Sequence, residues 1–191
     1  MSEPAPRHPL QQRVTAAILD GAAQIFAVQG EQASMNDVAE AAGVARATVY
    51  RYFPNRETLL DELARAAVED VDARLASARI DEVTPQEGIA RAVRALVEVG
   101  DSFVLLARER RRSEPERFEQ RLAQPLRALF ERGQAGGDIR ADITGARLTE
   151  SLIGLIVGVL TSTPSLGRED MTATITGLFL DGARARGPRR P

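Results

Sequence analysis

Apolar residues recur at helical spacing along almost all of this 191-residue chain. The first run begins near Arg13, lies along one face of a helix and consists of Val14, Ala17, Ile18, Ala22, Ile25 and Phe26. Nowhere do apolar and polar residues alternate with the period of two that a half-buried strand requires. Aromatic residues make up only 4% of the chain, while alanine, leucine and arginine are abundant, which also favours helices. The sequence therefore predicts an all-α protein.

Residues that start or stop helices define two short helices after the first one. Ser34 followed by Asp37 is close to a capping box, in which the hydroxyl and the acid each accept a hydrogen bond from a backbone amide. Gly43 ends this helix, because glycine readily adopts the left-handed conformation that terminates helices. A third helix follows from about residue 45 to 53 and stops before Pro54. Two short helices joined by a tight turn predict a helix-turn-helix, whose second helix enters the DNA major groove.

Longer helices are predicted for the rest of the chain, from the same kinds of boundary residue. They are a helix capped by Asn55 and running to about residue 79, one capped by Thr84, starting at Pro85 and divided at Gly100, one capped by Ser113, kinked at Pro125 and closed by Gly133, Gly136 and Gly137, and two at about residues 143–162 and 169–185. The helix after Asn55 is long enough to connect two domains.

The charge of the third predicted helix indicates a DNA-binding surface. From Gly43 to Arg56 the chain reads GVARATVYRYFPNR, and its three arginines are its only charged residues. Val44 and Val49 provide an inward face, so several of the polar and bulky residues between them and after them face outward. Arginine pairs with guanine or phosphate, and threonine and tyrosine hydroxyls commonly reach the DNA backbone. An exposed basic helix in a helical bundle shows the same pattern, so the charge alone leaves both readings open.

The stretch from Ser34 to Leu60, SMNDVAEAAGVARATVYRYFPNRETLL, resembles the N-terminal domain of the tetracycline-repressor (TetR) family of bacterial regulators. Two positions depart from the family pattern: Ala45 stands where serine is common, and Arg56 where lysine is common. The resemblance implies a sequence-specific DNA-binding regulator, in this family most often a repressor, that binds double-stranded operator DNA. The residues expected to contact DNA are Ser34, Ala45, Arg46, Ala47, Thr48, Tyr50, Arg51, Tyr52 and Arg56.

The resemblance also implies a division of the chain and a homodimer. We expect a flexible arm at residues 1–12, a three-helix DNA-binding domain at 13–60, a helical effector-binding and dimerisation domain at 61–186, and a disordered tail at 187–191. In the family, the middle helices enclose a small-molecule cavity whose ligand changes the spacing of the two DNA-binding heads. The candidate cavity residues are Leu96, Phe103, Leu106, Phe118, Leu122 and Leu126, which predict a mostly apolar ligand if they do not simply fill the core.

Paired glycines on a broad apolar surface suggest where the dimer forms. Gly154 and Gly158 lie one turn apart, and small residues at that spacing let two helices approach closely. A helix buried inside a single subunit has the same pattern. The residues expected at the interface are Leu152, Gly154, Leu155, Gly158, Val159, Ile175, Leu178 and Phe179.

Other function classes lack the residues that they need. The chain has no cysteine, and its one histidine, His8, lies in the proline-rich arm, so we expect no metal site, no cofactor and no enzyme activity. The longest apolar run, residues 152–160, is shorter than the roughly 20 residues that span a bilayer, so we expect a cytoplasmic protein without membrane contact. Two alternatives remain: a DNA-binding dimer without a ligand, and a helical enzyme or carrier with a fortuitous basic helix.

Overall fold

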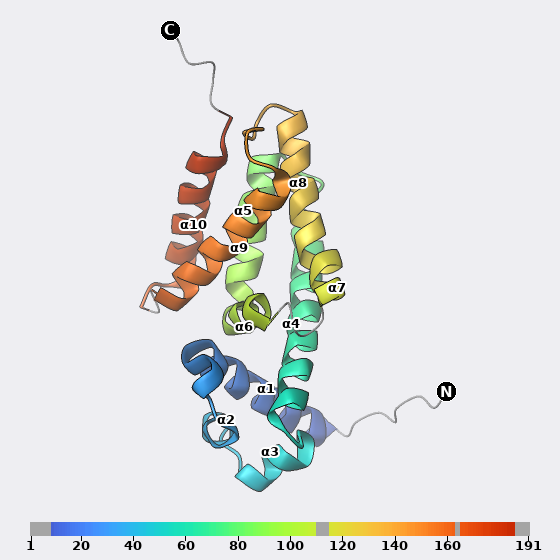
Figure 1. The fold of residues 1–191 in the computed structure, drawn as a ribbon, viewed down its shortest axis with the longest axis vertical. Helices are drawn as coiled ribbons and strands as arrows, with labels where there is room; N and C mark the ends of the chain where they lie inside the picture. The colour runs from blue at the N-terminus through green and yellow to red at the C-terminus, as the bar shows by residue number, and fades with distance from the viewer. Residues whose placement is uncertain (1–8, 110–114, 163–164, 186–191) are drawn as a thin grey trace, which may run out of the picture. The chain divides into compact units, whose positions relative to one another are not determined.

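The computed structural model describes residues 9–109, 115–162 and 165–185, and these residues form helices that fall into two compact units (Figure 1). The N-terminal unit extends to Leu63, and the C-terminal unit begins at Ala64. Within the described residues there is no strand, only an isolated bridge between Ile139 and Arg184. The predicted all-α fold is confirmed. The expected cap at Ser113 and the expected C-terminal tail lie outside the described residues.

The N-terminal unit is built from three helices and the start of a fourth. They are α1 (Pro9–Gln29), α2 (Met35–Ala41), α3 (Arg46–Tyr52) and the first residues of α4 (Arg56–Ala78). Helix α2 packs against both α1 and α3. The side chains of Ile18, Val38 and Val49 are fully buried and form the centre of this unit. Helix α1 begins at Pro9, so residues 9–12, which the sequence assigned to a flexible arm, are helical, as proline in a first turn allows.

A close contact between α1 and the end of α2 fixes the helix-turn-helix. A Cβ atom on Gly21 would lie only 2.7 Å from the backbone nitrogen of Ala42. Any side chain at this position of α1 therefore forces the end of α2 away. The glycine lets the two backbones meet and sets where the turn after α2 begins.

The C-terminal unit contains the rest of α4 and the later helices. They are α5 (Pro85–Val99), α6 (Asp101–Glu109), α7 (Pro115–Phe118), α8 (Gln124–Ala135), α9 (Gly145–Ser162) and α10 (Arg168–Ala183). Helix α5 is central, because it contacts α6, α8, α9 and α10. Thr84 caps α5 as the sequence predicts, and Gly100, with φ +65°, separates α5 from α6.

Pro125 widens its helix rather than breaking it. Helices α7 and α8 are joined by a π-helical turn, Glu119–Ala123, in which the Gln124 amide donates to the Glu119 carbonyl. Proline has no amide hydrogen, and its ring clashes with the carbonyl four residues earlier in a regular α-helix. The wider turn just before Pro125 relieves that conflict. Of the three glycines expected to close this helix, Gly133 lies inside α8, whereas Gly136 is its C-cap and Gly137, with φ +78°, follows it.

Helix α9 is the one described helix that is long and apolar enough to cross a membrane by length and composition alone. The same property belongs to core helices of globular proteins, and Leu148, Leu152 and Ile156 of α9 are buried in the core of the C-terminal unit.

Candidate nucleic-acid interface and effector region

The predicted capping box at the start of α2 is present. The Asp37 amide donates to Ser34 Oγ at 3.3 Å, and the Ser34 amide donates to Asp37 Oδ2 at 2.9 Å. The Ser34 hydroxyl also donates to Asp37 Oδ2 at 2.8 Å. These hydrogen bonds from Ser34, first from its backbone and then from its side chain, lower the pKa of the Asp37 carboxyl below its usual range. The Ser34 hydroxyl, expected to contact DNA, is thus already engaged in holding the first turn of α2.

The turn between α2 and α3 depends on Gly43. This residue has φ +65°, in the left-handed region, and its amide donates to the Glu40 carbonyl at 3.1 Å. The Val44 amide donates to the Ala39 carbonyl at 3.0 Å, which completes the closing turn of α2. Ala45 is the N-cap of α3 and supplies no side-chain hydrogen bond, as expected where serine is replaced by alanine.

Helix α3 has one buried face and one exposed face. Val49 is fully buried, and Phe53, just after the helix, is nearly so. Thr48 and Tyr52 are half-buried. The exposed residues are Ala45, Arg46, Ala47, Tyr50 and Arg51. Because α3 carries no acidic residue, this face presents two guanidinium groups and a phenol to any ligand.

Both exposed arginines of α3 lie against a tyrosine ring. The Arg46 Cζ atom is 5.3 Å from the centroid of the Tyr50 ring, and the Arg51 Cζ atom is 5.3 Å from that of Tyr52. Each contact is a cation–π interaction, which restricts the arginine side chain before any ligand binds. Side chains held in this way lose less conformational entropy when they contact a target.

Arg56 has a different environment from the other two arginines. Its Nη2 donates to the Gly30 carbonyl at 3.1 Å, and its guanidinium lies over the ring of Phe26. The side chain is half-buried. Arg56 is expected from the sequence to contact DNA, whereas in the structure it holds the start of α4 against the end of α1. A role in DNA contact stays a prediction.

The six residues expected to line a ligand cavity belong to the hydrophobic core. Leu96, Phe103 and Leu106 are fully buried, and Phe118, Leu122 and Leu126 are at most 5% exposed. Described residues of the C-terminal unit line clefts of about 420, 570 and 280 Å³, and none of the six residues lines any of these clefts. The clefts are instead bordered by charged residues that the sequence did not indicate as ligand-binding, such as Arg74, Arg94 and Arg168. Sequence spacing alone gives no signal for them, because they come from α4, α5 and α10.

The residues expected at a dimer interface divide into two groups. Leu152, Ile175 and Phe179 are buried in the core, where the Phe179 ring lies 5.5 Å from that of Phe130, so they have almost no surface to offer a partner. Gly154, Gly158 and Leu178 are exposed, and Leu155 and Val159 are half-buried. Within the described residues, no group of three or more acidic or histidine side chains is placed to hold a metal ion.

Comparison with known proteins identifies the N-terminal unit. The family model described as "Bacterial regulatory proteins, tetR family" matches residues 18–63. The regulator NfxB of Pseudomonas aeruginosa is 28% identical over 165 residues, which cover 82% of this chain and 87% of NfxB. The repressor LfrR of Mycolicibacterium smegmatis is 39% identical over 99 residues, covering 51% of this chain and 49% of LfrR.

Solved structures extend the similarity of fold to the C-terminal unit. The structure of LfrR in complex with proflavine aligns with this chain at a TM-score of 0.71 and 22% sequence identity. The alignment covers 91% of this chain and 97% of LfrR. AibR in complex with isovaleryl coenzyme A and operator DNA has a TM-score of 0.68 at 19% identity and covers 86% of this chain and 97% of AibR. Regulators of this family bind operator DNA and act as dimers, and they are not enzymes. Residues 18–63 form a DNA-binding domain of the TetR family, and the chain is a DNA-binding transcriptional regulator similar to members of that family.

Proposed function

We propose that this chain is a homodimeric repressor that binds operator DNA through the exposed face of α3 and is released by a small molecule. The observation that carries the proposal is the arrangement of α3, in which Val49 is buried while Arg46, Ala47 and Tyr50 are exposed on a helix without acidic residues. The small side chain of Ala47 allows close approach to a groove, and the flanking arginine and tyrosine supply hydrogen bonds to base edges. Arg51 lies at the end of the helix, where phosphate is the expected partner.

Selection of genomic fragments tests this proposal directly. The purified full-length protein is mixed with fragmented DNA from its source genome, and bound fragments are sequenced and footprinted. A palindromic site with half-sites about one helical turn apart is the expected result, because a symmetric dimer places two α3 helices in successive major grooves. Binding that fails to enrich any sequence over random fragments contradicts the proposal. Loss of repression of a reporter joined to the selected site, on deletion of the gene, tests the sign of regulation.

For the dimer, we propose a contact between the exposed faces of α9 and α10 and the same faces of a second copy. Four helical glycines support this choice: Gly154, Gly158, Gly177 and Gly182 each have no atom within 4 Å of an added Cβ. Glycine in a helix lowers stability by roughly 0.5–1 kcal/mol relative to alanine, and nothing in the described residues of one subunit compensates. Close approach of a partner helix accounts for all four. Leu178, 61% exposed, then gains an apolar environment.

A ligand-released mechanism is supported by α4 and by the relatives. Helix α4 is one continuous helix that begins in the N-terminal unit and ends in the C-terminal unit, so a ligand bound beside its C-terminal half acts on an element of the DNA-binding unit. LfrR was solved with proflavine, and AibR with both isovaleryl coenzyme A and operator DNA. We infer the same kind of coupling here, in the cytoplasm, where operator DNA is present. A ligand that lowers operator affinity must itself bind more weakly to the operator-bound dimer, by the same factor.

A further inference from the structure

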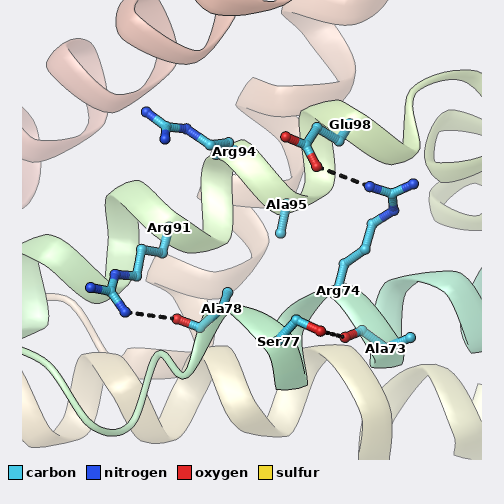
Figure 2. Close-up of a pocket in the computed structure, with 8 residues that line it drawn as sticks. All are labelled: Ala73, Arg74, Ser77, Ala78, Arg91, Arg94, Ala95 and Glu98. Atoms are coloured by element: carbon cyan, nitrogen blue, oxygen red, sulfur yellow. Dashed lines mark hydrogen bonds and ion pairs between the residues drawn. The ribbon is translucent and has the colours of Figure 1, made fainter.

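A cleft of about 420 Å³ lies between α4 and α5 in the C-terminal unit (Figure 2). Small side chains form much of its lining: Ala73, Ser77, Ala78 and Ala95. Two bridges between α4 and α5 border it, one from Arg91 to the Ala78 carbonyl at 3.2 Å and one from Arg74 to Glu98 Oε2 at 2.9 Å. The volume falls within the range of small-molecule sites. We refer to it as the α4–α5 cleft.

The charged residues that line the α4–α5 cleft are mostly basic. Its lining contains three arginines and one glutamate. Arg74 is shared between Asp70 and Glu98, each at 2.9 Å, and Arg91 pairs with Glu87 at 2.9 Å. Arg94 makes no hydrogen bond or ion pair with any residue in the described parts of the chain. One guanidinium group is therefore left without a counter-charge at the edge of a cleft with a partly apolar lining.

We propose that the α4–α5 cleft binds a small organic anion, whose acidic group pairs with Arg94 and whose compact apolar body lies against the alanines. A planar guanidinium recognises carboxylate and sulfonate groups through two parallel hydrogen bonds, and it loses less hydration than an ammonium group does. This class differs from the mostly apolar ligand expected from Phe103 and Phe118, because those residues lie in the core and the cleft is bordered by arginines.

The regulatory role of this site rests on the proposed function. Arg74, Ser77 and Ala78 belong to α4, the helix that continues from the DNA-binding unit. An anion that approaches Arg74 competes with Glu98 for the same guanidinium and so weakens a link between α4 and α5. The anion thereby favours a different position of the C-terminal half of α4, and a ligand with differential affinity for two positions shifts their populations.

A neighbouring cleft offers the nearest alternative. The α5–α10 cleft, of about 570 Å³, also includes Arg94 and Glu98, together with Arg168 and Glu169. Its two arginines are matched by two glutamates, and Arg168 Nη1 is engaged with the Glu98 carbonyl at 2.6 Å. The α4–α5 cleft has the larger excess of positive charge, so it is the better complement to an anion.

A pair of fluorescent probes that differ in charge tests the proposal. The full-length protein is titrated with 8-anilinonaphthalene-1-sulfonate, which carries a sulfonate on a compact aromatic body, and with N-phenyl-1-naphthylamine, which has the same rings without the charge. The chain has no tryptophan, so intrinsic tryptophan emission does not interfere. The wild-type protein binds the sulfonate more tightly than the neutral probe, and added salt weakens only the sulfonate.

Substitutions then locate the binding site. Arg94→Gln is expected to weaken sulfonate binding roughly 3- to 10-fold, since a partly exposed ion pair is lost, and to leave the neutral probe unchanged. Arg74→Gln gives a smaller loss. Arg65→Gln, which removes an exposed α4 arginine paired with Glu69 away from the cleft, is the matched control and has no effect. Thermal unfolding by circular dichroism checks that each variant is folded.

The other outcomes overturn the anion site or its regulatory role. Equal losses in Arg94→Gln and Arg65→Gln, or parallel losses of both probes, show non-specific binding and overturn it. If Arg168→Gln weakens sulfonate binding and Arg74→Gln does not, the anion binds in the α5–α10 cleft, and the proposal is overturned as well. Operator affinity measured with and without the sulfonate tests the regulatory role separately from the anion site. If the variants behave as expected but operator affinity does not change, the anion site stands and its regulatory role fails; if the anion does not bind, the DNA-binding regulator is unaffected.

Discussion

The guanidinium of Arg56 lies over the ring of Phe26, with 4.8 Å between its Cζ atom and the ring centroid. The same group donates to the Gly30 carbonyl, which belongs to the 3₁₀ turn directly after α1. Its Nε is buried without a hydrogen-bond partner in the described structure. Arg56 is the first residue of α4, so this one side chain ties α4 to the end of α1. Its geometry therefore predicts a contribution to stability that a surface phosphate contact does not make.

Arg56→Ala is expected to destabilise the protein by about 1 to 2 kcal/mol, since a cation–π contact and a hydrogen bond to a carbonyl are lost together. Arg56→Lys recovers only part of this, because an ammonium group does not stack flat on the ring. Denaturant unfolding of both variants measures the effect. A phosphate contact gives a different result: unchanged stability, with the slope of operator affinity against salt reduced by about one.

Arg46 and Arg51 are expected to act differently on DNA. Arg46→Ala costs roughly 1–3 kcal/mol on the operator and relaxes the base preference at particular positions, as expected of a base-edge contact. Arg51→Ala weakens operator and random DNA alike and lowers the salt slope by about one, as expected of a phosphate contact. Binding titrations on both DNAs at several salt concentrations distinguish them. Equal behaviour of the two variants contradicts the division.

Gly158→Arg is expected to break the dimer. The glycine lies on the exposed face of α9 with no atom within 4 Å of an added Cβ, so the arginine fits one subunit but blocks a partner. Sedimentation velocity at micromolar concentration measures the change, with Ala128→Arg on the exposed side of α8 as the control. A wild-type monomer, or a mutant that still dimerises, excludes this interface.

Asp37→Asn is expected to flatten the acid dependence of unfolding. In the folded protein the Ser34 hydrogen bonds hold the pKa of Asp37 below 3.8. The stabilisation is therefore present above that value and is lost as the pH falls through the lowered folded-state pKa. The melting temperature of the wild-type protein should fall more steeply with acid than that of the variant. If the melting temperatures of the two proteins fall in parallel between neutral and strongly acidic pH, the capping box has no role in acid unfolding.

Gly133→Ala is expected to destabilise the C-terminal unit by roughly 1–3 kcal/mol, through overpacking. An added Cβ would lie 2.5 Å from Ile139 Cγ1 and 3.0 Å from Pro85 Cβ, and both atoms belong to packed segments. Chemical denaturation of the variant and of the wild-type protein measures the difference in stability. A variant as stable as the wild-type protein would show that the neighbours of Gly133 yield easily.

The sequence by itself determined where most helices begin and end. Ser34 and Asp37 start α2, Gly43 ends it, and Thr84 starts α5, as the structure confirms. These boundaries depend on hydrogen bonds and backbone angles within a few residues of one another, which a local pattern encodes. The resemblance around α3 identified the family for a related reason, because the motif is contiguous in the chain.

The tertiary structure alone decided which way side chains face. Leu152 and Gly154 are two residues apart in one apolar helix, yet the first is fully buried and the second is exposed. The Arg56 guanidinium lies over Phe26, and Ile139 packs so close to Gly133 that a side chain at this position of α8 would clash with it. The arginines of the α4–α5 cleft come together only when α4 and α5 pack side by side. Such contacts join residues far apart in the chain, and their register is set by the packing of whole helices, which short-range patterns do not encode.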